Sequence, residues 1–331
     1  MQNRNFDYLR PAVNLIPEDI RPNVEVYKEY MKYAFLENPS LKTWKNYIFQ
    51  PGFEPESAQF AYNQWEPRDN DVIVATFPKA GTTWTRELLR QIIYLKDEEN
   101  LKKSKAMNYF FSYLEFGPVS KYLVTDNIPL PRRVLGTHLA ADLINFEKLK
   151  SKGTKIIYVT RNPKSQAVSW YPFARADYFM HKEFFQKRYP EDEKAFLDMY
   201  INGQQSMCAK EGEGYLEHIR SWYQHKDDEN VLFLCFEEMK KDVTKQVRRL
   251  ADFIDVSLSD DDVKKVCQNS SLGKMKKSWD TPDMPPTFFF RKGQVGDWKN
   301  HLTVAQSEKI DANVERVLGD TDIKFIYELE Q

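Results

Sequence analysis

The residues with the clearest capacity for chemistry lie in residues 76–84, which read TFPKAGTTW. This stretch follows a short apolar run and opens a segment with helical spacing. The first N–H groups of a helix have no partner inside the helix, and the helix dipole adds partial positive charge there. Gly81 lets the backbone approach a ligand closely, and Lys79 adds a point charge. Thr82 and Thr83 contribute hydroxyl donors. We therefore predict a site for a phosphate- or sulfate-bearing ligand.

The order of lysine and glycine in this stretch argues against an ordinary ATP site. A Walker A loop reads GxxxxGK[ST], with the lysine after the second glycine. Here Lys79 precedes Gly81, and no GK[ST] occurs in the stretch. A kinase would also need an identifiable magnesium-binding arrangement, and none can be assigned from the sequence. The sequence therefore argues against a nucleoside or nucleotide kinase.

A second candidate anion site follows another apolar run. Residues 161–171 read RNPKSQAVSWY. Ligands of open α/β sheets bind outside the carboxyl ends of the strands, where Arg161 can hold a phosphate through two hydrogen bonds. Ser169 can reach the same ligand if the following helix packs beneath it. The alternative is a surface ion pair at Arg161 beside an ordinary helical serine.

A third basic segment lies at residues 289–299, which read FFRKGQVGDWK. Arg291 and Lys292 precede Gly293, so they form a flexible basic loop suited to a phosphate. The same triplet is also common on solvated surfaces.

One histidine is placed to act as a general base. His138 follows the predicted strand that begins near Arg133, so it lies at the carboxyl end of that strand. The alternative is a structural histidine held by hydrogen bonds. The other histidines occur in charged or helical contexts and are predicted to be surface residues: His181, His218, His225 and His301.

Short apolar runs alternate with helical patterns and would position these groups. The runs lack strict polar–apolar alternation, which is typical of strands covered on both faces in a parallel sheet. We predict strands at residues 72–75, 133–137, 155–160 and 231–236. In residues 82–95 an apolar helical stripe recurs at Trp84, Leu88, Ile92 and Leu95. The predicted fold is a single α/β domain with a central parallel sheet flanked by helices, and its strand-loop-helix resembles that of nucleotide kinases.

Two long stretches, residues 109–131 and 173–205, are rich in aromatics, charges and prolines. They are predicted to cross the ligand edge of the sheet as lids or acceptor walls, and ordinary surface helices are the alternative. Their candidate pocket rings are Tyr109, Phe110, Phe111, Tyr113, Tyr178 and Phe179.

Composition excludes several classes of protein. The formal net charge of −1 argues against a nucleic-acid binder that relies on a bulk positive field. Three cysteines without metal-ligand spacing fit a reducing compartment. Residues 1–22 lack a signal-peptide core, and no apolar run approaches the roughly 20 residues of a membrane span. A cytoplasmic protein without a membrane or nucleic-acid partner is expected.

Taken together, these motifs resemble the cytosolic sulfotransferase family over residues 65–327. The family's 5′-phosphosulfate loop reads TYPKSGTTW, and residues 76–84 differ only at Phe77 and Ala80. The family's RKGxxGDWK motif is complete in residues 291–299. The resemblance implies a sulfotransferase domain over residues 51–331, with residues 1–50 as an N-terminal extension of unknown role.

The resemblance implies a transferase of the EC 2.8.2 type. It would move a sulfuryl group from 3′-phosphoadenosine 5′-phosphosulfate (PAPS) to a hydroxyl or amine of a small apolar acceptor such as a phenol, steroid or alcohol, leaving PAP. His138 would be the general base, Lys79 would stabilise the leaving phosphate, and no metal is required. The implied nucleotide-binding residues are Lys79, Ala80, Gly81, Thr82, Thr83, Trp84, Arg161, Ser169, Phe236, Ser270, Phe289, Phe290, Arg291, Lys292 and Gly293.

The chain departs from the family pattern at a few positions. Gly136 stands where members usually have the lysine of KTHLP, Phe236 stands where many have tyrosine, and Leu272 replaces a phenylalanine. The first departure supports an alternative, a catalytically weak PAPS- or PAP-binding member with an interaction role. A homodimer is implied by the motif KxxxTVxxxE at Lys299, Thr303, Val304 and Glu308. An exposed helix start capped by the threonine is the alternative.

Overall fold

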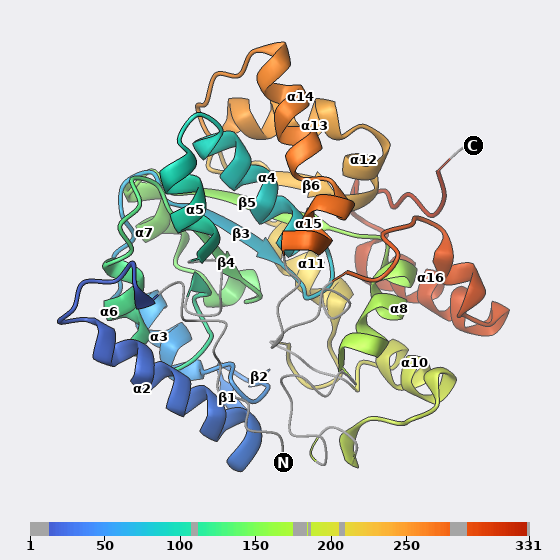
Figure 1. The fold of residues 1–331 in the computed structure, drawn as a ribbon. Helices are drawn as coiled ribbons and strands as arrows, with labels where there is room; N and C mark the ends of the chain where they lie inside the picture. Colours follow the sequence, from blue (N-terminus) through green and yellow to red (C-terminus); the bar gives the residue numbers. More distant parts are fainter. Residues whose placement is uncertain are drawn as a thin grey trace.

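The computed structural model describes residues 13–106, 112–174, 184, 187–204, 209–278 and 290–329. Its centre is a four-stranded sheet in the order β4-β3-β5-β6, with every neighbouring pair parallel (Figure 1). The strands are β3 (Val72–Thr76), β4 (Val134–Thr137), β5 (Lys155–Thr160) and β6 (Val231–Cys235). These strands confirm the predicted parallel α/β class.

Helices cover both faces of this sheet. One face is covered by α4 (Thr82–Tyr94), α12 (Phe236–Lys241), α13 (Val243–Phe253) and α14 (Asp260–Asn269). The other core receives side chains of α2 (Arg21–Lys32), α3 (Pro55–Asn63), α6 (Lys121–Asp126), α7 (Phe146–Ser151), α8 (Pro163–Ala174), α10 (Glu193–Ile201), α11 (Tyr215–Tyr223) and α16 (Val304–Leu318). Further elements are α5 (Glu98–Ala106), α15 (Leu272–Ser278) and the 3₁₀ turns η4 (Ala141–Leu143) and η6 (Asp297–Asn300).

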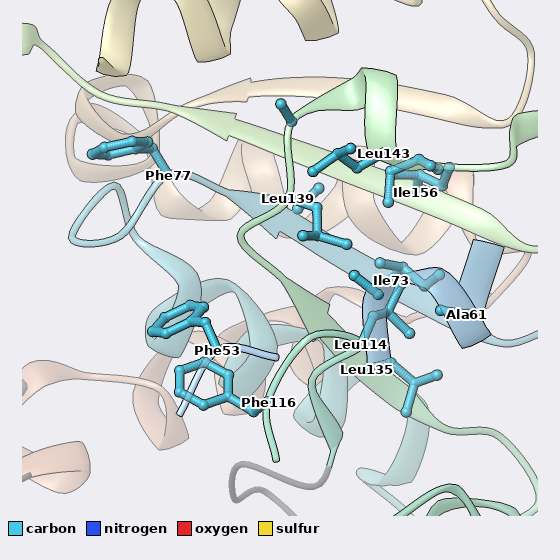
Figure 2. Packing of buried hydrophobic residues seen from close by; sticks show 14 of the residues in the cluster. Phe53, Ala61, Ile73, Phe77, Leu114, Phe116, Leu135, Leu139, Leu143 and Ile156 are labelled. Carbon is cyan, nitrogen blue, oxygen red and sulfur yellow. The ribbon is translucent and has the colours of Figure 1, made fainter. Parts of the chain in front are cut away.

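Both faces of the central strand are buried, which explains its unbroken apolar pattern. Val72 and Val74 pack in the core with α4, α13 and α14. Ile73 enters the opposite core, where Figure 2 shows it near Leu135 and Leu114. A strand with water on neither face has no position for alternating polar residues.

Strand order creates one edge where ligand-binding loops meet. β3 pairs with β4 on one side and with β5 on the other, so the chain reverses its direction across the sheet after β4, and the switch point lies between β3 and β5. Parallel register brings the carboxyl ends together, because Ala75 pairs with Thr137 and Thr76 pairs with Val159. Open α/β sheets bind ligands at such a switch point.

The described part of the N-terminal segment contains regular secondary structure. Between α2 and α3 lie a π-helical turn, η2 (Tyr33–Glu37), and a hairpin of β1 (Lys42–Trp44) and β2 (Tyr47–Phe49). Val24, Tyr27 and Met31 of α2 are fully buried in the core. The helix presents them at helical spacing, so this segment contributes to the fold itself.

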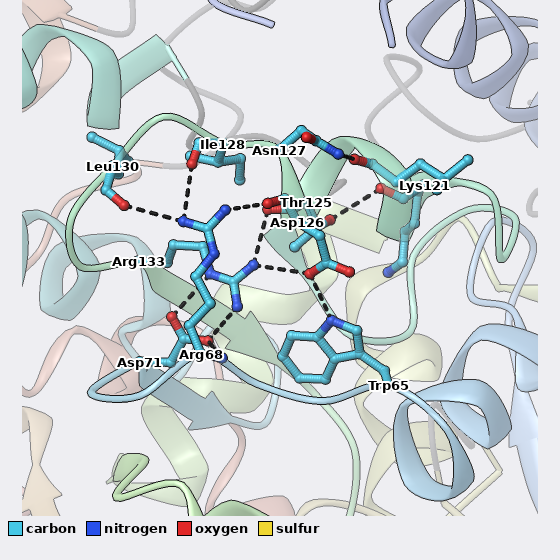
Figure 3. A network of polar contacts seen from close by, with 11 residues as sticks. Trp65, Arg68, Asp71, Lys121, Thr125, Asp126, Asn127, Ile128, Leu130 and Arg133 are labelled. Carbon is cyan, nitrogen blue, oxygen red and sulfur yellow. Dashed lines mark hydrogen bonds and ion pairs between the residues drawn. The ribbon is translucent and has the colours of Figure 1, made fainter. Parts of the chain in front are cut away.

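A network of polar side chains lies at the N-terminal ends of β3 and β4, the amino edge of the sheet (Figure 3). Arg133 Nε donates to Asp71 Oδ1 at 2.9 Å, and Arg133 Nη1 donates to Asp126 Oδ1 at 3.0 Å. Trp65 Nε1 also donates to Asp126 Oδ1, at 2.9 Å, and the Arg68 N–H donates to Asp71 Oδ2 at 2.9 Å. The network satisfies a buried guanidinium at the end opposite the predicted site.

Within the described ranges, no helix is both long enough and apolar enough to cross a bilayer.

Candidate active site

The loop between β3 and α4 has the backbone of an anion cradle. Gly81 caps α4 with φ of 125°, and Lys79 also has a positive φ, 66°. A Cβ at Gly81 would lie 3.0 Å from Phe236 Cδ2, so both the backbone angle and the space favour glycine here. The first N–H groups of α4 therefore lie at the carboxyl edge of the sheet.

Contacts from the sheet and from α8 hold this loop. Thr76 Oγ1 and Thr82 Oγ1 share a hydrogen bond of 2.6 Å. Gln166 Nε2 donates to the Pro78 carbonyl at 2.9 Å, and Arg161 Nη1 donates to the Lys79 carbonyl at 2.8 Å. The loop is thus preorganised by the protein's own side chains.

The loop forms part of a cavity of about 390 Å³. The cavity brings together most of the residues singled out in the sequence. It is lined by Lys79, Gly81, Thr82, Thr83, Trp84, His138, Arg161, Ser169, Phe236, Ser270, Phe290, Arg291 and Gly293, among others. Ala80 is buried and does not line the cavity. Phe289 lies outside the described residues.

The cations of this cavity repel one another. Burial, followed by repulsion from Arg161 and Arg291, lowers the pKa of Lys79 to about 7. Arg161 is buried, and among the described residues no carboxylate lies within ion-pair distance of it. The Nε of Arg161 and the Oγ of Ser270 are buried with no hydrogen-bond partner in the described structure. An anion in this cavity would relieve the repulsion and satisfy these atoms.

Asp297 organises the basic loop, a role that the sequence did not reveal. Arg291 Nη1 donates to Asp297 Oδ2 at 2.6 Å, and Lys292 Nζ donates to Asp297 Oδ1 at 2.8 Å. Burial alone would raise the pKa of Asp297, but hydrogen bonds from Lys292, Asn300 and Arg291 hold it well below its usual range. Arg291 lines the cavity, whereas Lys292 does not. The aspartate within the GDWK motif is the one feature of the sequence that could have indicated this role.

Two aromatic rings lie at the same cavity. Trp84 and Phe236 are 5.6 Å apart between ring centroids and meet edge to face at 72°. Trp84 Nε1 donates to the Ser270 carbonyl at 3.1 Å, which fixes the indole. Because the two rings are not parallel, a planar base in this arrangement can stack on one of them but not on both.

His138 is held as a neutral base. Its Nδ1 lies 2.7 Å from the Thr76 carbonyl, and because a carbonyl can only accept, Nδ1 carries the proton. The other ring nitrogen, Nε2, is then an acceptor. Burial lowers the pKa of His138 to about 4, and the charge of Arg86 acts in the same direction. The ring is therefore unprotonated at neutral pH.

The prediction that His218 is a surface residue was wrong. His218 is buried, and its Nε2 donates to the Leu139 carbonyl at 3.1 Å. Its Nδ1 lies 2.9 Å from the Tyr158 hydroxyl. Burial lowers the pKa of His218 to about 3. The feature of the sequence that could have indicated this burial is the position of His218 beside Ile219 and Trp222 on the apolar face of α11.

Packing explains Gly136. A Cβ at this position would lie 2.9 Å from Tyr113 Cε1, because the Tyr113 ring covers the glycine. The same ring lies 5.2 Å from the His138 ring and 4.8 Å from the Arg86 guanidinium carbon. The space beside residue 136 is therefore occupied by the Tyr113 ring.

Further aromatic side chains line this cavity. They are Phe53, Tyr113, Phe116 and Phe173. Only Tyr113 was among the predicted pocket rings, and Tyr109, Phe110, Phe111, Tyr178 and Phe179 lie outside the described residues. Phe53 carried no signal, because nothing local places the N-terminal segment against β4.

The described structure therefore combines a parallel α/β sheet with a cationic loop, a buried neutral histidine and aromatic side chains around one cavity. Residues 69–322 match the family model described as a sulfotransferase domain. The chain therefore belongs to the sulfotransferase family, and it is a transferase of the EC 2.8.2 type.

Known relatives span most of the chain. Amine sulfotransferase of Oryctolagus cuniculus is 31% identical, over 81% of this chain and 87% of its own length. Sulfotransferase 1E1 of Bos taurus is 32% identical, over 79% and 88%. The crystal structure of mouse sulfotransferase SULT7A1 complexed with PAP is 28% identical, with a TM-score of 0.67 over 85% and 96%. Retinol dehydratase, solved with retinol and PAP, shares the fold at 22% identity, with a TM-score of 0.69 over 94% and 98%.

Proposed function

We propose that this protein transfers a sulfuryl group from PAPS to a hydroxyl or amine of a small apolar acceptor, leaving PAP. One observation carries the proposal: a single cavity contains both a cluster of cations, Lys79, Arg161 and Arg291, and the neutral His138. PAP in the solved mouse relative supports the choice of nucleotide.

The donor set suits a nucleotide with two phosphate groups. Lys79, Thr82 and Thr83 with the N-terminus of α4 would hold the 5′ end. The 3′-phosphate would bind Arg161, Ser169 and Arg291, all of which line the cavity. Lys292 would act through Asp297 by fixing the basic loop. Burial of Arg161 strengthens its attraction for an anion, because the local dielectric is low.

Two side chains would move protons and charge in the reaction. His138 Nε2 accepts the acceptor's proton as the acceptor oxygen or nitrogen bonds to sulfur. The bond from sulfur to the 5′-phosphate oxygen breaks, and that oxygen keeps the electron pair. Protonated Lys79 stabilises the developing negative charge. Positioning and charge stabilisation supply most of the rate, as in phosphoryl transfer.

The aromatic wall favours an apolar acceptor. The Phe53 and Phe116 centroids lie 4.0 Å apart, and the Phe53 ring lies 6.3 Å from the His138 ring. A phenol, steroid or other alcohol would bury its hydrocarbon against these rings and present its hydroxyl to the base. The amine sulfotransferase relative supports amines as a second acceptor class.

A homodimer is part of the proposal. Val304 is 75% exposed at the start of α16, which is unusual for a large apolar residue. Thr303 caps that helix by accepting from the Gln306 N–H at 3.2 Å, so the motif also has a local structural use. Light scattering of wild type and Val304→Glu would decide between the two, since only a dimer contact predicts dissociation.

The direct test is transfer of label from PAPS to a panel of phenols, sterols and amines. His138→Ala should lower kcat by about 10²–10⁴-fold, the usual contribution of a positioned base. PAP affinity should stay within about twofold, because Lys79 and Arg161 lie in the loops after β3 and β5, away from the strand that precedes His138. A wild-type protein that neither binds PAP nor transfers label would overturn the proposal.

A catalytically weak nucleotide-binding member with an interaction role is the second candidate, and Gly136 is the observation that favours it. The protein would then bind PAP but transfer label to no acceptor. Packing of Tyr113 against Gly136 offers a structural reason for the glycine that does not require loss of activity.

A further inference from the structure

One fully buried carboxylate beside the cavity has no part in the mechanism above. Glu115 Oε1 accepts from the His138 backbone N–H at 2.8 Å. Glu115 Oε2 accepts from Thr137 Oγ1 at 2.9 Å. The same threonine oxygen accepts from the Leu139 N–H at 3.1 Å. Both oxygens of the Glu115 side chain therefore accept hydrogen bonds from the C-terminal end of β4, at Thr137 and at His138.

The backbone around Glu115 is also attached to β4. The Leu114 N–H donates to the Gly136 carbonyl at 3.0 Å, and Tyr113 forms a parallel bridge with Gly136. The Glu54 N–H donates to the Glu115 carbonyl at 2.7 Å. A side chain at residue 136 would collide with the Tyr113 ring, so the glycine permits this close approach.

The residues on either side of Glu115 line the acceptor part of the cavity. Tyr113 and Phe116 are both wall residues. One short segment thus carries the wall and holds the strand end that carries the base.

A buried cation accompanies the carboxylate. Lys121 is fully buried, its charge attracts Glu115, and its Nζ donates to the Tyr113 carbonyl. Burial raises the pKa of Glu115 and lowers that of Lys121, and each group partly offsets the burial cost of the other.

We propose that Glu115 is a positioning residue, which sets the orientation of the His138 base relative to the acceptor wall through its two hydrogen bonds to β4. This inference rests on the proposed function, since it assigns a partner to the proposed base. The nucleotide groups Lys79 and Arg161 belong to the loops after β3 and β5, so they do not depend on Glu115.

Kinetics of three variants test the positioning role. Glu115→Ala removes both hydrogen bonds and should lower kcat by about 10–100-fold, as a small displacement of a reacting group does. PAP affinity should stay within about twofold. Glu115→Gln keeps one acceptor for the His138 N–H and one donor for Thr137, so kcat should recover to within about fivefold of wild type.

Glu54→Ala is the matched control. Glu54 is also a buried carboxylate, but its side chain pairs with Lys42 instead of β4. It should lose stability like Glu115→Ala and keep kcat within about threefold. Equal kcat losses in the Glu54 and Glu115 alanine variants would overturn the positioning role.

A second readout does not need catalysis. In wild type the His138 ring should stay neutral, with its proton on Nδ1, in ¹⁵N NMR spectra down to about pH 5. Its pKa should rise toward about 6.5 in Glu115→Ala, because a displaced ring is better solvated. The titratable groups around the ring in the described structure are Arg86 on α4, His218 on α11, Tyr113 and Glu115 itself, whose pKa is raised by burial. Glu115→Gln removes that carboxyl group but keeps the hydrogen bonds, so it separates loss of the charge from displacement of the ring.

The two readouts separate this inference from the proposed function. If wild type transfers no sulfuryl group, the proposed function fails, and the NMR titration still decides the role of Glu115. An unchanged His138 titration in Glu115→Ala, with unchanged kcat, would overturn the inference. If that variant does not fold, Thr137→Val replaces it, since it removes one of the two bonds; a kcat drop of about threefold or more supports the role, and no drop contradicts it.

Discussion

The two ends of the central sheet treat a buried arginine in opposite ways. At the amino edge, Arg133 bonds two carboxylates, Asp71 and Asp126 (Figure 3). At the carboxyl edge, Arg161 bonds the Lys79 carbonyl, and among the described residues no carboxylate lies within ion-pair distance of it. The side chains are the same in type and both are buried.

The difference separates a structural charge from a binding charge. A buried guanidinium is stable when carboxylates compensate it, and removing one partner then leaves a costly unpaired charge. At Arg161 the attraction of Glu237 acts only from beyond ion-pair distance, and the neighbouring Lys79 has a lowered pKa, so this guanidinium keeps its attraction for a ligand. The charges at the amino edge therefore stabilise the fold, whereas the charges at the carboxyl edge lower its stability and favour the binding of an anion.

The largest expected effect is on stability at the amino edge. Arg133→Met should lower the free energy of unfolding by about 3–5 kcal/mol, because it leaves Asp71 buried without its cation. Chemical denaturation of the nucleotide-free protein measures the loss, and PAP affinity of the folded fraction should not change. A loss below about 1 kcal/mol would mean that the network is not needed for folding.

The same substitution at the carboxyl edge should weaken PAP binding more than it lowers the free energy of unfolding. Arg161→Met should weaken PAP binding by about 10–100-fold, the worth of charge-assisted hydrogen bonds. The free energy of unfolding should fall by less than in Arg133→Met, because the lost bond to the Lys79 carbonyl and the lost attraction to Glu237 are partly offset by less repulsion among the cavity cations. Titration calorimetry and denaturation measure the two quantities. A large stability loss with unchanged affinity would erase the contrast between the two edges.

The sequence predicted the carboxyl edge better than the amino edge. Strand-loop-helix spacing and apolar runs identify β3, β4, β5 and β6, because local pattern determines those elements. The cradle of residues 76–84, with Arg161 and His138, could be predicted because parallel strands must end at one edge.

Long-range partners were not predictable in the same way. Glu115 lies more than 20 residues before His138, and Asp126 is joined to Trp65 across 61 residues. Nothing local distinguishes these acids from surface acids, since only the tertiary fold decides which charge is buried. Phe53 was missed for the same reason, because its segment reaches the cavity through contacts that no periodic pattern records.

The smallest expected effect is a proton linked to binding at the carboxyl edge. The pKa of Lys79 is lowered to about 7, so between about pH 7 and its ordinary value of 10.5 the unfolded chain holds the extra proton. The free energy of unfolding of the nucleotide-free protein should therefore rise with pH across that window. Anion binding restores the lysine charge, so PAP affinity should fall as pH rises above about 7.

Calorimetry at pH 8 in buffers with different ionisation heats would count the proton. Uptake should approach one proton per PAP bound, since a phosphate monoester with its second pKa near 6 contributes little at that pH. Lys79→Met should abolish the uptake, whereas Arg133→Met should preserve it, because that arginine lies at the opposite end of β3. Uptake that persists in Lys79→Met would assign the proton to another group and would show that the unbalanced charge of this edge is not centred on the loop after β3.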